Sequence, residues 1–132
     1  MSDAHVLRID EHTVIDRGNG ISSIPLAGEK TNAINISNGI TAFPRGAAIE
    51  LHTHNTEEAV TLLEGLADCE VNGERHRVKP FDTTYIPAGI PHRFINVGEG
   101  PMKILWVYGS THVTRTFVAS GETLGQFGRY DK

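Results

Sequence analysis

Three histidines and one glutamate stand at spacings that could bring four metal ligands together. His52 and His54 are separated by one residue, Glu58 follows shortly after, and His92 comes later in the chain. Alternate side chains of a strand face the same way, so His52 and His54 would share a face. Imidazole nitrogen and carboxylate oxygen suit divalent transition metals. The four residues therefore predict a metal site.

The local sequence around Glu58 and His92 predicts how they join the histidine pair. Glu58 opens the run Glu-Ala-Val-Thr-Leu-Leu just after Asn55 and Thr56, which suit a turn. This order predicts a neighbouring antiparallel strand that carries Glu58 close to the pair. His92 is predicted to begin another strand, after Pro91. Three imidazoles and a carboxylate would be costly to bury without a partner, and a metal would be that partner.

These residues form part of a longer pattern of glycines, prolines and polar residues. The first part runs from Gly46 to Gly65, and the second covers residues 81–96 and includes Pro87 and Gly89. Together they resemble the two consensus motifs of the cupin superfamily. The resemblance implies an all-β fold, a double-stranded β-helix or jelly-roll barrel of the small RmlC-like type.

The resemblance also implies roles for single residues. His52, His54, Glu58 and His92 would be the metal ligands, and Asn96 would close the second motif. Phe81 departs from the pattern, because the family has a glycine there. A bulky residue would be strained in a turn that needs positive φ, so we expect this turn to be built differently.

The composition predicts one domain over residues 1–132 with a core of its own. The net charge of −4 and the absence of a basic patch argue against nucleic acid or an anionic membrane as a partner. The N-terminus lacks the features of a signal peptide, and no apolar run approaches the roughly 20 residues of a membrane span. We expect a cytoplasmic protein. Cys69 is the only cysteine and is interpreted as a small apolar core residue.

Short β-rich runs separated by glycine and proline cover most of the sequence. Strands are predicted at 21–26, 32–43, 47–54, 57–64, 66–72, 75–79, 83–87, 91–97, 101–108 and 113–118. Between two of them, Asn72-Gly73 favours the type I′ turn of a two-residue hairpin.

The alternation along residues 101–108 predicts an inward and an outward face. Met102, Ile104, Trp106 and Tyr108 would point inward. Leu105 and Val107 would then need cover on the outside. The N-terminal arm, residues 1–30, or a second subunit could supply it, so we expect a homodimer.

Further residues are candidates for substrate binding or catalysis. Phe43, Trp106 and Tyr108 would line the cavity around the metal or belong to the plain core. Asn96 should point inward with His92. Arg115 is either a solvated strand residue or a clamp for a substrate carboxylate.

Glu50 shares the strand parity of His52. It is either a partner of the metal ligands, able to act as acid or base at the cavity mouth, or a solvated residue at the end of the strand. The remaining histidines, His5, His12, His76 and His112, are expected on the surface.

The ligand set suits one divalent transition metal per chain, with Fe(II) or Mn(II) as first choice and Zn, Ni or Co also suitable. If the ion is six-coordinate, four protein ligands leave two positions for substrate, dioxygen or water. Glu58 could also act as a base beside the metal.

Three functions follow from this site. The first is a metal-dependent oxygenase, similar to cupin dioxygenases, that acts on a small oxygen-rich metabolite. The second is a non-redox isomerase or lyase for a sugar acid or keto acid. The third is a binding module without turnover. One barrel supports many chemistries, so the fold does not choose among them.

Overall fold

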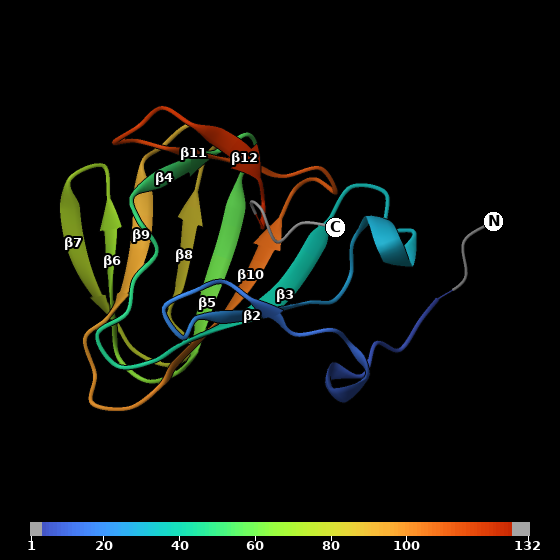
Figure 1. The fold of residues 1–132 in the computed structure, drawn as a ribbon, viewed down its shortest axis with the longest axis horizontal. Helices are drawn as coiled ribbons and strands as arrows, with labels where there is room; N and C mark the ends of the chain where they lie inside the picture. The colour runs from blue at the N-terminus through green and yellow to red at the C-terminus, as the bar shows by residue number, and fades with distance from the viewer. Residues whose placement is uncertain (1–3, 128–132) are drawn as a thin grey trace.

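A computed structural model of the protein describes residues 4–127. Its strands form two antiparallel six-stranded sheets that face each other in a jelly roll (Figure 1). The first sheet has the order β1 (Ile15–Asp16), β2 (Ser22–Pro25), β3 (Ser37–Phe43), β10 (Met102–Tyr108), β5 (Glu58–Glu64) and β8 (Thr83–Ile86). The second has the order β12 (Thr123–Gly125), β11 (Thr114–Phe117), β4 (His52–His54), β9 (His92–Asn96), β6 (Ala67–Val71) and β7 (Glu74–Val78).

Nine of the ten predicted strands contain an observed one, and the predicted strand 75–79 overlaps β7, which begins one residue earlier at Glu74. Two predicted strands are shorter in the structure, because residues 32–36 and 47–51 lie outside the strands except for a bridge between Ala48 and Ile95. The sequence-based prediction missed β1, β12 and the short 3₁₀ helices η1 (Ile9–Glu11) and η2 (Glu29–Thr31). The fold class is confirmed.

The hairpin of β6 and β7 has the predicted turn. Val71 pairs with Glu74, which leaves a two-residue loop. Asn72 has a φ of 51° and Gly73 a φ of 90°. Positive φ at both central positions is what a type I′ turn requires, and this turn matches the twist of the flanking strands.

The turn at Phe81 differs from the expectation. Phe81 adopts a φ of 74° although it is not glycine, so the turn is not built differently. The neighbouring hydrogen bonds hold this conformation: Asp82 N–H donates to the Lys79 carbonyl, and Phe81 N–H donates to the Leu62 carbonyl. The side chain is 79% exposed, so little packing compensates the backbone strain.

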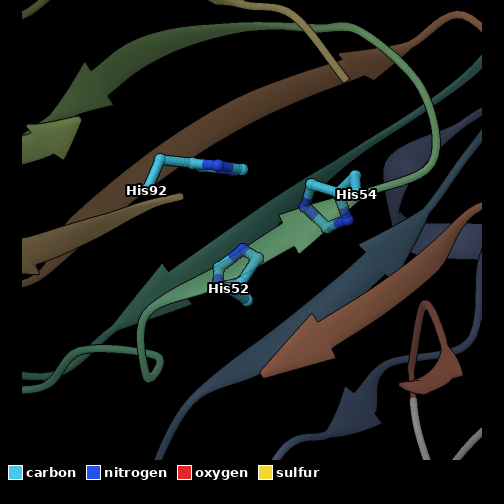
Figure 2. Close-up of side chains that lie close together, drawn as sticks. All are labelled: His52, His54 and His92. Carbon is cyan, nitrogen blue, oxygen red and sulfur yellow. The ribbon is translucent and has the colours of Figure 1, made fainter. Parts of the chain in front are cut away.

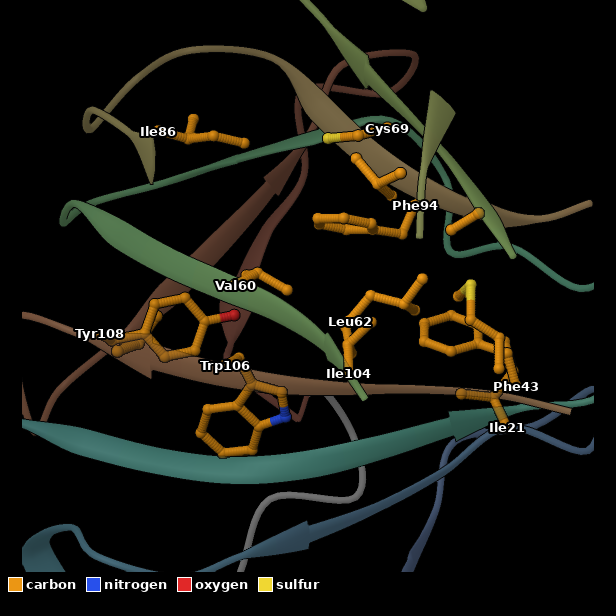
Figure 3. Close-up of a cluster of buried hydrophobic side chains, with 14 residues drawn as sticks. Ile21, Phe43, Val60, Leu62, Cys69, Ile86, Phe94, Ile104, Trp106 and Tyr108 are labelled. Atoms are coloured by element: carbon orange, nitrogen blue, oxygen red, sulfur yellow. The ribbon is translucent and has the colours of Figure 1, made fainter. Parts of the chain in front are cut away.

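The core fills the space between the two sheets (Figure 3). Along β3, β5 and β10 buried residues alternate with more exposed ones, as a strand with one inward face requires. Met102, Ile104, Trp106 and Tyr108 are all buried, as predicted. Cys69 is a buried free cysteine of this core, as expected. None of the helices within residues 4–127 is both long and apolar enough to cross a membrane.

Candidate metal centre

His52, His54 and His92 converge at one end of the barrel interior (Figure 2). His52 and His54 both point inward from β4, and His92 is the first residue of β9, where it is the Cα partner of His52. All three are buried. One ring nitrogen from each lies within 4.8 Å of those of the others. These distances are short enough for one ion to contact all three rings.

The backbone fixes which nitrogen of each ring faces this point. Nδ1 of His52 lies 2.6 Å from the Glu50 carbonyl oxygen, Nδ1 of His54 lies 3.0 Å from that of Thr114, and Nδ1 of His92 lies 2.8 Å from that of Ile90. A carbonyl oxygen only accepts, so each Nδ1 carries the hydrogen. A neutral ring then has its lone pair on Nε2, which is the tautomer that binds a metal.

Glu58 reaches the histidines from the opposite sheet. Its Oε1 lies 2.7 Å from Nε2 of His92 and 3.4 Å from Nε2 of His54. The expectation of a neighbouring strand is wrong, because β5 pairs with β10 and β8 and not with β4. The carboxylate crosses the barrel interior instead.

Two of these atoms lack a hydrogen-bond partner. Neither Oε1 of Glu58 nor Nε2 of His92 forms a hydrogen bond with good geometry, although they are in contact and fully buried. Two acceptor lone pairs at this distance repel unless a proton or a cation lies between them. The three imidazoles therefore fit a divalent metal, and the Glu58 carboxylate is in contact with two of them.

Burial controls the protonation of two of the histidines. It lowers the pKa of His54 to about 4, against the opposing effect of Glu58. It also lowers the pKa of His52 far below its usual value, and the charge of Arg115 adds to this. Burial acts in the same direction on His92, but the contact with Glu58 outweighs it and raises the pKa of His92. His52 and His54 are thus neutral at physiological pH, as metal binding requires.

The three imidazoles and Glu58 line a cavity of about 40 Å³. Phe43, Trp106 and Tyr108 line it as well. Their role in binding a substrate stays a prediction. The Tyr108 hydroxyl lies 3.3 Å from Nε2 of His54, and the indole N–H of Trp106 donates to the hydroxyl of Thr41.

Arg115 also lines the cavity and is only 6% exposed. The interpretation as a solvated strand residue is therefore wrong. Burial raises the pKa of the Tyr108 phenol, and the nearby charge of Arg115 opposes this effect. Arg115 is the Cα partner of His54 in the pairing of β11 with β4, which brings it to the cavity.

Two candidates lie outside the cavity lining. The side chain of Glu50 is exposed, in line with the reading of a solvated residue, and only its carbonyl supports the site. Asn96 points inward, but its side chain is occupied elsewhere. Its amide donates to the carbonyls of Phe43, Pro44 and Gly100, and its oxygen accepts from Gly98 N–H. Asn96 anchors loops and does not reach the cavity.

The prediction missed three further polar residues of the lining, Arg17, Thr41 and Gln126. They belong to segments outside the two motifs, and their own residue types carry no spacing signal. Arg17 donates to the hydroxyl of Ser23, which in turn shares a hydrogen bond with Thr41. The histidines His5, His12, His76 and His112 do not line the cavity.

The fold and the histidine cluster define a jelly-roll β-barrel with a candidate metal site inside. A family model for the cupin domain matches residues 39–108, which is more than half of the chain. This chain therefore belongs to the cupin domain family.

Among curated proteins, the uncharacterized protein MJ1618 of Methanocaldococcus jannaschii is 43% identical over 63 residues. The match covers 47% of this chain, and it spans only about half, 50%, of that relative.

Several solved structures share the fold. The sugar phosphate isomerase of the cupin superfamily from Silicibacter pomeroyi has a TM-score of 0.73 at 19% identity, covering 97% of each chain. KdgF from Halomonas sp. has a TM-score of 0.71 at 20% identity, covering 81% of this chain and 94% of that one. Oxalate decarboxylase of Bacillus subtilis has a TM-score of 0.74 at 23% identity, covering 84% of this chain and 31% of that one.

Proposed function

We propose that this chain is a metal-dependent enzyme, a mononuclear Fe(II) or Mn(II) oxygenase that acts on a small oxygen-rich metabolite. The carrying observation is the convergence of the Nε2 atoms of His52, His54 and His92, with the unpartnered oxygen of Glu58 in contact with two of these rings. These four residues would hold one metal ion. When bound, the ion supplies redox chemistry and a Lewis acid for substrate oxygen atoms.

The residues around the metal ligands shape the cavity and orient the ligands. Phe43, Val60 and Phe94 give the cavity apolar walls, which would limit the access of water to the metal. The Tyr108 hydroxyl contacts His54 and limits its ring orientation. Structural neighbours that share the fold include an oxalate decarboxylase and a sugar phosphate isomerase, which supports an enzyme on a small polar compound.

The oxygenase proposal is tested by assaying the Fe(II)-loaded and Mn(II)-loaded protein against a panel of small oxygen-rich metabolites. We expect turnover with oxygen uptake that stops under nitrogen. Turnover that continues unchanged without oxygen would contradict the proposal. Binding of a ligand with no turnover under any condition would favour a binding module.

Glu58→Gln serves as the matched variant in this assay. The amide has nearly the same shape but no negative charge, so metal binding should weaken and turnover should be lost. Elemental analysis of the same sample separates the two effects. Glu57→Gln, an adjacent residue outside the cavity lining, is the control and should behave as the wild type.

A non-redox isomerase or lyase is the second candidate. Oε1 of Glu58 lacks a hydrogen-bond partner and could take a proton from a substrate that a metal polarises. This alternative predicts full activity with Zn(II) or Mg(II) and no oxygen uptake. A strict requirement for a redox-active metal would count against it.

A further inference from the structure

Arg115 is a buried cation without an acidic partner. Within residues 4–127, no carboxylate lies within ion-pair distance of its guanidinium. Its Nε has no hydrogen-bond partner, and the Tyr108 phenol beside it is neutral because burial raises its pKa. Buried charges are costly unless they are paired, so this site is incomplete in electrostatic terms.

The guanidinium faces the same small space as the histidines. Arg115, His54 and Tyr108 all line the cavity, and Arg115 lies beside His54 across the pairing of β11 with β4. The charged residues of the lining, apart from the imidazoles, are Arg115, Arg17 and Glu58. Arg115 thus faces a lining whose one carboxylate is that of Glu58, and a bound divalent cation would add positive charge beside it.

We propose that Arg115 is the anion-binding group of the cavity, and that the ligand is a small carboxylate with an adjacent oxygen donor, a 2-oxo or 2-hydroxy acid. This inference rests on the proposed function, because the histidine end would receive the donor oxygen while Arg115 receives the carboxylate. The planar guanidinium matches a carboxylate in two parallel hydrogen bonds.

The size of the cavity selects the class of acid. A buried water needs roughly 10–15 Å³ of such space, and the cavity offers about 40 Å³. This is room for about three waters, so the enclosed part of the site favours a small acid over a sugar phosphate. Tyr108, whose hydroxyl lies 3.3 Å from Nε2 of His54, lines the same cavity as Arg115.

The test measures binding by isothermal titration calorimetry on Mn(II)-loaded and chelator-treated protein. The probes are pyruvate and 2,3-butanedione, which have similar shapes but differ in the carboxylate. We expect the wild type to prefer pyruvate by at least about tenfold, as a charge-assisted hydrogen bond predicts. Arg115→Gln should lose this preference and leave the affinity for the diketone unchanged.

Two further variants make the result specific. Arg115→Lys keeps the positive charge but lacks the two parallel N–H donors of a guanidinium. Its affinity for pyruvate should lie between those of the wild type and Arg115→Gln. Arg93→Gln is the matched control, because Arg93 pairs with Glu70 and does not line the cavity, so it should behave as the wild type. Inorganic phosphate is the competing anion and should bind more weakly than pyruvate.

The proposal is overturned if Arg115→Gln binds pyruvate as tightly as the wild type, or if phosphate binds at least as tightly as pyruvate. If Arg115→Gln does not unfold cooperatively, the test uses the wild type and Arg115→Lys instead. A wild type that does not prefer pyruvate over the diketone would then overturn the proposal. Oxygen uptake measured on the same samples tests the oxygenase proposal separately from the Arg115 proposal. Pyruvate binding through Arg115 without oxygen uptake would contradict the oxygenase alone.

Discussion

Nδ1 of each of the three site histidines is oriented by a backbone carbonyl. Glu50, Thr114 and Ile90 contribute only their carbonyl oxygens. Substitution of these three residues therefore leaves the orienting groups in place. The rings are held with their lone pairs toward the cavity before any ligand arrives, which reduces the cost of ordering on binding.

Removal of one histidine should abolish stoichiometric metal. His52→Ala is expected to lower the metal affinity by at least about tenfold, the lower end of what the loss of even a supporting partner costs. Elemental analysis of protein purified without added metal measures this. His76→Ala, an exposed histidine outside the cavity, is the control. Full metal content in His52→Ala would contradict the assignment.

Phe81 should be replaceable by glycine with a gain in stability. The residue has a φ of 74° and an exposed side chain. A left-handed conformation costs an L-residue roughly 1–2 kcal/mol, which glycine avoids at a smaller entropic cost. We expect Phe81→Gly to raise the free energy of unfolding by about 0.5–1 kcal/mol in urea titrations.

Phe81→Ala is the control for this prediction. Alanine keeps the Cβ that makes positive φ unfavourable, so its stability should stay close to that of the wild type. A loss of stability in Phe81→Gly would mean that the aromatic ring has a role that the backbone strain does not explain.

Spacing alone was enough to pair His52 with His54, since the strand period puts them on one face whatever the rest of the fold, whereas His92 was found through the resemblance to the second motif. Arg115 was different. Its burial depends on the pairing of β11 with β4 and on the position of Tyr108 in the other sheet. Neither is a local property, so an arginine in an alternating run looked like a surface residue.

At the level of elements, strand positions could be predicted and sheet membership could not. The period of two and the glycine and proline boundaries locate β5 and β4 in sequence. Which sheet each one joins depends on long-range pairing, as in β5 with β10. For this reason Glu58 was expected beside the histidine strand but lies across the barrel from it. The two-residue strand β1 was too short to leave a pattern.

The hairpin of β6 and β7 should depend on its glycine. Gly73 has a φ of 90°, and a Cβ there would meet nothing within 4 Å, so only the backbone conformation opposes a side chain. Gly73→Ala should therefore lower the free energy of unfolding by about 1–2 kcal/mol.

Gly100→Ala is the matched control for the hairpin variant. Its Cβ would also meet nothing, but its φ is not positive, so the change should be close to neutral. Chemical denaturation of the two variants measures the difference. Equal free energies of unfolding for Gly73→Ala and Gly100→Ala would show that the positive φ at Gly73 does not affect stability.

For the whole molecule, the homodimer stays a prediction. Leu105 and Val107 on the outer face of β10 are only half-buried, and Val6 and Val14 near the N-terminus are exposed. We expect light scattering after size exclusion to give twice the mass of the chain. Val107→Glu should shift the protein toward the monomer, whereas Glu99→Gln on an exposed loop should not. A monomeric wild type would contradict the prediction.

Strands β4 and β9 share one residue pair, His52 with His92, whereas β6 and β9 share five. The two ligand-bearing strands are thus joined weakly along their backbones. An ion held by both would act as a cross-link at this seam. Amide hydrogen exchange in β4 should therefore slow when metal is added and recover with a chelator. The rate of amide exchange in β4 would then report metal occupancy, even while the substrate is unknown.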